Sequence, residues 1–198
     1  MKVIGLTGGI GSGKTTVANI LRDKYHAYVI FSDEVAKELM EPGQISYRLI
    51  VETFGTTVLD VDKRLDRQKL ALMVFGNSGK LALLNSLTHP YVEQFILEEI
   101  KRVRETKQYQ LVVVESALLL QVNYDKFCDE VWVVVAEEQV RRQRLIRSRG
   151  YSNEKIDAIL EKQMTDEDFR KYTTKIIENS GNMKNITNQI QNMLECLE

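Results

Sequence analysis

Apolar residues divide this chain into short β-branched runs and longer stretches with helical periodicity. The runs at residues 3–6, 28–31, 111–115, 131–135 and 175–178 each predict a strand. The third is apolar at nearly every position, as expected of a strand that is covered on both faces of a sheet. Because helical segments separate most of these runs, the chain predicts an α/β fold with a five-stranded parallel sheet flanked by helices.

The stretch between the second and third predicted strands, residues 42–106, contains no convincing buried strand. Its apolar residues recur at helical spacing within residues 46–54, 67–75, 80–87 and 92–103. Such a long helical insertion indicates a substrate-facing subdomain. At the other end of the chain, Ile186, Ile190 and Leu194 keep helical spacing despite many Asn and Gln residues, and predict a final helix over residues 183–197.

A glycine-rich turn, GGIGSGKT at residues 8–15, follows the first predicted strand and precedes a helical pattern. It fits G-x-x-x-x-G-K-[ST], the phosphate-binding P-loop. Backbone N–H groups converge on phosphate oxygens only where side chains do not obstruct them, and the helix dipole favours the same anion. We expect Lys14 to reach the β- and γ-phosphates of ATP and the Thr15 hydroxyl to hold Mg²⁺. The predicted nucleotide-binding residues are Gly9, Gly11, Ser12, Gly13, Lys14, Thr15 and Thr16.

A dinucleotide-binding turn is the main alternative, because Asp33 lies roughly twenty residues on, where such a fold places its ribose-binding acid. The glycine spacing excludes it. A G-x-G that starts at Gly9 places Lys14 at the third glycine, and one that starts at Gly11 places Thr16 there. The turn therefore predicts a site for a nucleoside triphosphate.

Two residues outside the loop carry open alternatives. Asp33 follows the second predicted strand, at the edge where open α/β sheets bind ligands, but it also opens a helical pattern. Spacing alone supports a functional carboxylate and a helix N-cap equally. His89 precedes Pro90, which predicts an extended backbone there. A lone histidine is more often structural than a ligand.

Charged residues after the third and fourth predicted strands indicate phosphate chemistry. Glu115 ends the third, where P-loop proteins often carry an acid that orients the water shell of the metal. The segment after the fourth looks helical, as do residues 156–164, and it carries Arg141, Arg142, Arg144, Arg147 and Arg149. A solvated face or a nucleic-acid patch would explain these arginines, but a net charge of −1 favours a local role. We therefore predict a mobile arginine lid at residues 139–172, which neutralises a transferring phosphate and excludes water.

Composition narrows the class of protein. A length of 198 residues, 43% hydrophobic and 28% charged, suits one globular α/β domain. Two cysteines, Cys128 and Cys196, argue against a disulfide framework, and we expect Cys128 to pack in the core. No signal peptide and no apolar run of membrane-spanning length are apparent. We expect a cytoplasmic monomer or weak homo-oligomer that binds neither membrane nor nucleic acid.

Missing motifs exclude two classes of P-loop protein: there is no N-K-x-D as in GTPases and no L-S-G-G-Q as in transport ATPases. Over almost its whole length the sequence instead resembles the dephospho-coenzyme A kinase family. Residues 5–18 match that family's form of the loop, and Ser32-Asp33 matches part of its D-A-D motif. Further matches are Leu65-Asp66-Arg67, Leu70-Ala71, Val74-Phe75, His89-Pro90, Leu118-Leu119, Arg144-Leu145, Gln163-Met164, Arg170 and Asn179-Ser180-Gly181.

The resemblance implies ATP-dependent phosphorylation of the ribose 3′-hydroxyl of dephospho-coenzyme A, the last step of coenzyme A biosynthesis. It places Asp33 on the family's proposed catalytic base and implies an electrostatic role for Lys14, Arg141, Arg144 and Arg170. Thr7, Arg67 and His89, with Asp33, are its substrate-side candidates, and Thr15 and Glu115 its metal-side candidates. Residues 41–107 would bind the coenzyme, and residues 1–40, 108–138 and 173–198 would form the nucleotide-binding core.

The sequence departs from the family pattern at several positions. Phe31 replaces the first Asp of D-A-D, and the family's D-x-P-L-L-x-E has Glu115, Ala117 and Gln121 at its first, third and last positions. Glu115 keeps the charge on a longer side chain, whereas Gln121 loses a carboxylate. Two other functions therefore stay open: a small-molecule or nucleoside kinase with another acceptor, and a non-catalytic module that uses ATP as a switch.

Overall fold

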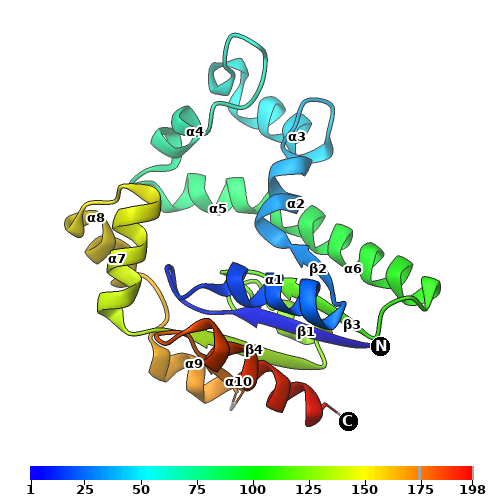
Figure 1. Ribbon diagram of the computed structural model, residues 1–198. Helices are drawn as coiled ribbons and strands as arrows, with labels where there is room; N and C mark the ends of the chain where they lie inside the picture. Colours follow the sequence, from blue (N-terminus) through cyan, green and yellow to red (C-terminus); the bar gives the residue numbers. More distant parts are fainter. Residues whose placement is uncertain (174, 198) are drawn as a thin grey trace. The chain divides into compact units, whose positions relative to one another are not determined.

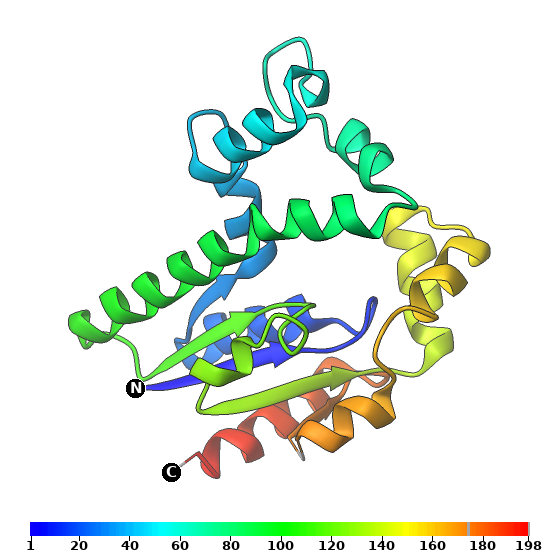
Figure 2. The same cartoon turned by 180° about the vertical axis from the view of Figure 1, so that it is seen from behind.

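The computed structural model describes residues 1–173 and 175–197. The chain divides into two units, of which the first contains residues 1–30 and 103–198 and the second residues 31–102. Figures 1 and 2 show the ribbon from opposite sides.

The first unit is built on a five-stranded sheet with the order β2-β3-β1-β4-β5 (Figure 1). Its strands are β1 (Lys2–Thr7), β2 (Tyr28–Phe31), β3 (Leu111–Glu115), β4 (Glu130–Val135) and β5 (Ile176–Glu178). Strand β1 pairs in parallel with both β3 and β4, and β4 pairs in parallel with β5. All five predicted strands are confirmed, and their ends differ from the predicted ones by at most one residue.

Burial explains why the central strands read as continuous apolar runs. Residues 111–115 of β3 are all buried, and Trp132 and Val133 of β4 are fully buried. In the register of the sheet, Leu6 lies opposite Glu115 and Thr7 opposite Val133. Because parallel strands end at the same edge, this register brings Thr7, Glu115 and the loop after β1 to one edge of the sheet.

Helices flank this sheet: α1 (Lys14–Tyr25), α7 (Glu138–Arg149), α8 (Asn153–Leu160), α9 (Asp166–Tyr172) and α10 (Met183–Glu195), with the 3-10 helix η2 (Tyr124–Phe127). The predicted final helix is confirmed as α10, whose Ile186 and Ile190 are buried. Phe169 of α9 packs on Val133 and Val135 of β4. The helix predicted over residues 156–164 is wrong in its second half, because α8 ends at Leu160 and residues 161–163 form a turn.

The second unit is helical, as predicted. It contains α2 (Ser32–Leu39), α3 (Ile45–Phe54), η1 (Thr56–Val58), α4 (Arg67–Val74), α5 (Ser78–Ser86) and most of α6 (His89–Thr106). After Phe31 its residues, all of which the structure describes, form no strand, only an isolated bridge between Leu59 and Leu65. Ile50, Val58 and Leu70 form a core that joins α3, η1 and α4.

The conformation predicted for His89 is wrong, because His89 is the first residue of α6 rather than part of an extended segment. The carbonyl of Thr88 accepts a hydrogen bond from the N–H of Val92 at 3.1 Å and so closes the first helical turn. Pro90 is therefore the second residue of the helix. The missing N–H of proline costs little there, because N–H groups of the first turn have no intrahelical acceptor.

Within the described residues, none of the helices combines the length and the apolar character that crossing a membrane requires.

Candidate active site

The P-loop joins the carboxyl end of β1 to the first turn of α1. Gly13 is the N-cap of α1, with φ of 93° and ψ of 29°, a left-handed conformation that side chains disfavour. A Cβ atom on Gly13 would also lie 2.1 Å from Nδ2 of Asn179. Glycine therefore lets the loop enter the helix directly, so that the N–H groups of the first turn face an anion at this end.

Every backbone carbonyl from Gly8 to Gly13 accepts a hydrogen bond. The Nζ of Lys14 donates to Gly8 at 2.8 Å and to Gly9 at 3.1 Å, so its ammonium group is held by the loop that it follows. The N–H groups of Thr16 and Val17 donate to Gly13. The other three carbonyls, those of Ile10, Gly11 and Ser12, accept from side chains of α7 and of the segment after β5.

Arg141 of α7 lies against the tip of the loop. Its side chain is largely buried, and its Nε donates to the carbonyl of Ile10 at 2.9 Å. One terminal nitrogen lies only 2.5 Å from the place where a Cβ of Gly9 would stand, so a side chain at Gly9 would collide with the guanidinium. The other lies 3.8 Å from Oδ1 of Asp166, which offsets the cost of burying the charge.

Arg144, one turn further along α7, ties the loop to the segment after β5. One terminal nitrogen donates to the carbonyls of Gly11 at 3.3 Å and Ser12 at 3.2 Å, and the other to the carbonyl of Asn179 at 2.7 Å. The buried Asn179 side chain completes the network, since its Nδ2 donates to the carbonyl of Ser12 at 2.7 Å. All these bonds end on carbonyl oxygens, so they stabilise the loop without competing with an anion for its N–H groups.

Two hydroxyl groups at the loop are buried and have no hydrogen-bond partner within the described chain: Oγ1 of Thr7 and Oγ of Ser12. A buried polar group without a partner costs about 1–3 kcal/mol. Such groups are rare in native proteins and frequent at sites where a ligand or water completes their bonds. The loop thus fits a phosphate ligand, both by its glycine backbone and by these two hydroxyls.

The metal-side candidates lie at the same edge of the sheet. Thr15 is exposed at the start of α1, and Glu115 is buried at the end of β3. The described part of the chain contains no cluster of three or more His, Cys, Asp or Glu side chains that could hold a metal ion.

Arg170 stands apart from these contacts. It lies exposed in α9, and no hydrogen bond or ion pair joins its side chain to another described residue. The structure thus brings Lys14, Arg141 and Arg144 together on the loop but not Arg170.

In the second unit, Asp33 is the second residue of α2 and is exposed. The N-cap of α2 is Phe31, whose side chain makes no capping bond, so the N-cap alternative for Asp33 is wrong. A carboxylate in the first turn is still favourable, because it faces the positive end of the helix dipole. A functional role for the Asp33 carboxylate therefore stays a prediction.

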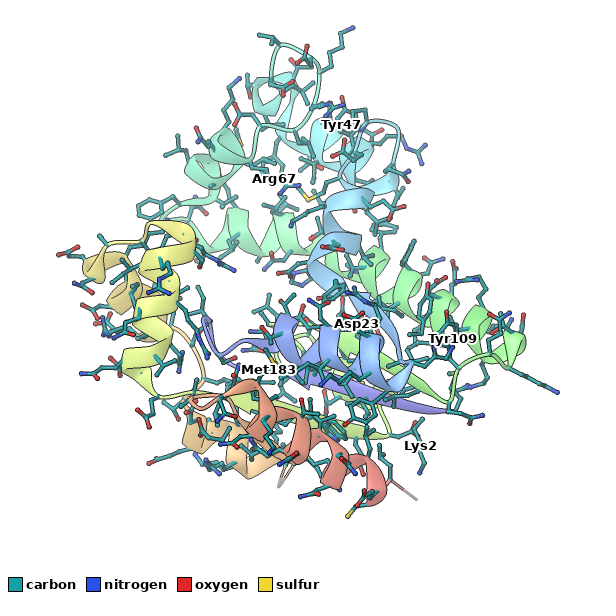
Figure 3. All side chains as sticks on the ribbon, in the orientation of Figure 1. Lys2, Asp23, Tyr47, Arg67, Tyr109 and Met183 are labelled. Carbon is teal, nitrogen blue, oxygen red and sulfur yellow. The ribbon has the colours of Figure 1, made fainter. Side chains whose placement is uncertain are left out.

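Arg67 and His89 begin α4 and α6 of the same unit (Figure 3 labels Arg67). Asp66, just before Arg67, is the N-cap of α4 and accepts hydrogen bonds from the N–H groups of Gln68 and Lys69 at 2.9 and 3.1 Å. His89 is half-buried, and this burial lowers its pKa, which favours the neutral imidazole. No hydrogen bond or ion pair links Asp33, Arg67 and His89 to one another within residues 31–102.

Cys128 takes no part in this chemistry. Its Sγ donates to the carbonyl of Tyr124 at 3.2 Å. Burial, with smaller contributions from Asp125 and Asp129, raises the pKa of the thiol to about 12. A thiol with such a pKa is a poor nucleophile, which agrees with the packing role expected from the sequence.

The family model for dephospho-CoA kinase matches residues 2–185. The chain belongs to the dephospho-CoA kinase family. A relative from Carboxydothermus hydrogenoformans with this name is 36% identical over 195 residues, which cover 98% of this chain and 94% of the relative. Another, from Fusobacterium nucleatum, is 33% identical over 195 residues, 98% of each chain.

Solved structures support the fold. A Thermus thermophilus protein superposes with a TM-score of 0.82 at 31% identity, over 100% of this chain and 98% of that chain. A shikimate kinase from Bacteroides thetaiotaomicron has a TM-score of 0.56 at 16% identity, over 99% and 98%, and shows the P-loop kinase fold alone.

Two residues contact the loop although the sequence assigned them no role and only matched them to motifs of the dephospho-CoA kinase pattern. Asn179 holds the carbonyl of Ser12, and Oε1 of Gln163 accepts a hydrogen bond from the N–H of Ile10 at 2.9 Å. Their places in family motifs were the only signal that could have singled them out. Among the departures from the family pattern, Gln121 removes a carboxylate, but the carboxylate that faces Arg141 here comes from Asp166.

Proposed function

We propose that this protein transfers the γ-phosphoryl group of ATP to the ribose 3′-hydroxyl of dephospho-CoA and releases CoA and ADP. Membership of the dephospho-CoA kinase family over residues 2–185 supports this reaction. The observation that carries it is the P-loop itself, whose carbonyls are all bonded while two buried hydroxyls at the same loop have no partner among the residues that the structure describes. A loop built in this way is ready to bind an anion.

On the donor side, the ammonium of Lys14 moves from the carbonyls of Gly8 and Gly9 to the phosphate oxygens. The N–H groups of the loop and the hydroxyls of Thr7 and Ser12 complete the cradle. Thr15 would hold Mg²⁺, and Glu115 would orient the water around it. The metal ion, when bound, neutralises charge on the β- and γ-phosphate oxygens.

On the acceptor side, Asp33 orients the 3′-hydroxyl and takes its proton as the oxygen forms a bond to the γ-phosphorus. The bond from that phosphorus to the bridging oxygen breaks, and ADP leaves. Phosphoryl transfer passes through a loose transition state, so positioning matters more than the strength of the base. Arg67 and a neutral His89 are the proposed ligands of the rest of the acceptor.

The arginines divide into two groups by their contacts. Arg141 and Arg144, which lie in the predicted lid, are bonded to loop carbonyls and would act on the phosphates from beside the loop. Arg170 has no ion pair within the described residues and is the arginine available to follow the transferring phosphate. Removing one such donor from a transition state typically costs about 2.7–4 kcal/mol.

An ADP-release assay with ATP and Mg²⁺, with and without dephospho-CoA, tests the proposal when the product mass is also measured. Strong stimulation by dephospho-CoA and a product heavier by one phosphate are expected. ATP binding without stimulation would refute the acceptor, and a panel of nucleosides and small alcohols would then test another kinase activity. ATP binding without turnover on any acceptor would favour the switch module.

A further inference from the structure

Both backbone polar groups of Ile10, at the tip of the P-loop, are bonded to side chains of residues distant in sequence. Its carbonyl accepts from Nε of Arg141 at 2.9 Å, and its N–H donates to Oε1 of Gln163 at 2.9 Å. These partners lie 131 and 153 residues away along the chain, and all three residues belong to the first unit.

Gln163 is held in place by the elements on either side of it. The N–H of Gln163 donates to the carbonyl of Leu160 at 3.2 Å, which closes the turn after α8. Just beyond, Thr165 and Asp168 form a capping box that starts α9, and α9 packs on β4 through Phe169. The side chain of Gln163 therefore projects from a short connection that is fixed at both ends.

Ile10 lies where two sets of loop contacts meet. Lys14 holds the carbonyls of Gly8 and Gly9 before it, and Arg144 holds those of Gly11 and Ser12 after it. The N–H of Ile10 shares a peptide plane with the carbonyl of Gly9, and the carbonyl of Ile10 shares the next plane with the N–H of Gly11. Gln163 and Lys14 therefore hold the peptide group before the Cα of Ile10, and Arg141 holds the peptide group after it.

We propose that Gln163 is a positioning residue for phosphoryl transfer, which acts by accepting the N–H of Ile10 and so fixing the tip of the P-loop. The proposal rests on the kinase function proposed above. Because the bond needs only an acceptor oxygen at this position, glutamate can replace glutamine in it, whereas leucine of similar size cannot.

The chain offers a matched control in Gln189 of α10. Its Oε1 accepts the N–H of Glu178 at 2.8 Å, and its Nε2 donates to the carbonyl of the same residue at 2.9 Å. This glutamine also supports backbone in the first unit, but it does not contact the P-loop. Gln189→Leu therefore reports the cost of losing a glutamine side chain that bonds to backbone elsewhere in this unit.

The experiment compares Gln163→Leu, Gln163→Glu and Gln189→Leu with the wild type, by kcat, KM for ATP, Tm and the amide exchange rate of Ile10. For Gln163→Leu we expect about a tenfold lower kcat with KM for ATP changed less than about threefold, because the lost bond positions the transition state more than it binds ATP. In Gln163→Leu the amide exchange of Ile10 should become faster, and Tm should fall no more than it does in Gln189→Leu. Gln189→Leu should keep the kcat of the wild type. Gln163→Glu should recover most of kcat at saturating ATP, although its charge near the phosphates raises KM for ATP.

Three outcomes would overturn the proposal: an unchanged kcat in Gln163→Leu, an equal loss of kcat in Gln163→Glu, or a similar loss in Gln189→Leu. The second would assign the effect to the amide NH₂ and the third to general destabilisation. If the wild type itself failed to phosphorylate dephospho-CoA, the proposed function would fall instead. The exchange rate of Ile10 would then still decide whether Gln163 holds the loop.

Discussion

Asn179 offers the sharpest test of how the loop is supported, because one small side chain reaches it from beyond β5. In Asn179→Ala the bond from Nδ2 to the carbonyl of Ser12 at 2.7 Å is lost, as is the longer contact with Arg144 at 3.4 Å. The backbone bonds of Asn179, from its N–H to Val135 and from Arg144 to its carbonyl, remain.

The size of the effect follows from these contacts. A typical hydrogen bond contributes about 0.5–1.5 kcal/mol net, and more when a buried partner is left unsatisfied. Here the carbonyl of Ser12 keeps its bond from Arg144 at 3.2 Å, so it is not left without a donor. We therefore expect a loss of about 1–2 kcal/mol in the free energy of unfolding. For a chain of this length, that loss lowers Tm by about 2–8 °C.

We expect Asn179→Ala to lower activity as well as stability. The carbonyl of Ser12 precedes Gly13, the N-cap of α1, so loosening it disturbs the N–H groups proposed to cradle the phosphates. We expect kcat/KM for ATP to fall about tenfold, which corresponds to about 1.4 kcal/mol in the transition state. Thermal unfolding and ADP release under varied ATP measure the two effects separately.

Asn182→Ala is the control, because Asn182 also supports backbone in the first unit: it caps α10 through a bond from the N–H of Asn185 at 3.0 Å. Loss of this cap should cost about 1 kcal/mol and leave kcat/KM for ATP unchanged. Two results would contradict this account of Asn179. In the first, Asn179→Ala loses stability but keeps its kcat/KM for ATP; in the second, Asn182→Ala loses as much kcat/KM for ATP as Asn179→Ala does.

The remaining predictions concern Asp33, His89 and the two cysteines. Asp33→Ala should abolish turnover while calorimetry still detects ATP binding; near-normal ADP release would exclude Asp33 as the base. His89 titrates below its ordinary pKa of 6.5 in the folded state because of burial, so the unfolded state binds more protons as the pH falls below 6.5 and stability decreases. His89→Gln should remove this contribution to the pH dependence of stability. The free energy of unfolding in urea of His89→Gln, relative to that of the wild type, should therefore be higher at pH 5 than at pH 7. A difference between the two proteins that is the same at both pH values would contradict a lowered pKa for His89. A thiol reagent at pH 8 should label the exposed Cys196 and spare Cys128, whose pKa is raised to about 12, until the protein is unfolded; equal rates in the native state would rule out its burial.

Local signals were sufficient to predict the sheet and the P-loop. Runs of β-branched residues specify buried parallel strands, and the loop motif combines glycine spacing with the strand and the helix around it. Two local rules failed for identifiable reasons. The α2 helix begins at Ser32, two residues earlier than an Asp33 cap requires, and Pro90 lies in a first turn that tolerates it.

The support of the loop could not be predicted, because it depends on contacts across most of the chain. Asn179 lies 167 residues from Ser12, and Gln163 reaches Ile10 only because α8 ends in a turn that its helical pattern did not indicate. Periodicity reports which face of an element is buried, but not which polar side chain will meet a particular backbone group.

The carbonyls of the loop are bonded and its buried hydroxyls are not. This difference explains why so many polar groups from distant parts of the chain contact the loop. Because the carbonyls of residues 8–13 all accept hydrogen bonds, the peptide planes of the loop are ordered before a nucleotide binds. The free energy of nucleotide binding is therefore not reduced by the entropy cost of ordering the loop. The opposite is true of Thr7 and Ser12, whose buried hydroxyls lack partners within the described residues and destabilise the fold until a ligand or water satisfies them. A loop whose acceptors are all bonded and whose buried hydroxyls are not favours one class of ligand, an anion rich in acceptor oxygens. The residues that impose this preference, Arg141, Arg144, Gln163 and Asn179, lie outside the loop motif, so the motif alone does not account for the site.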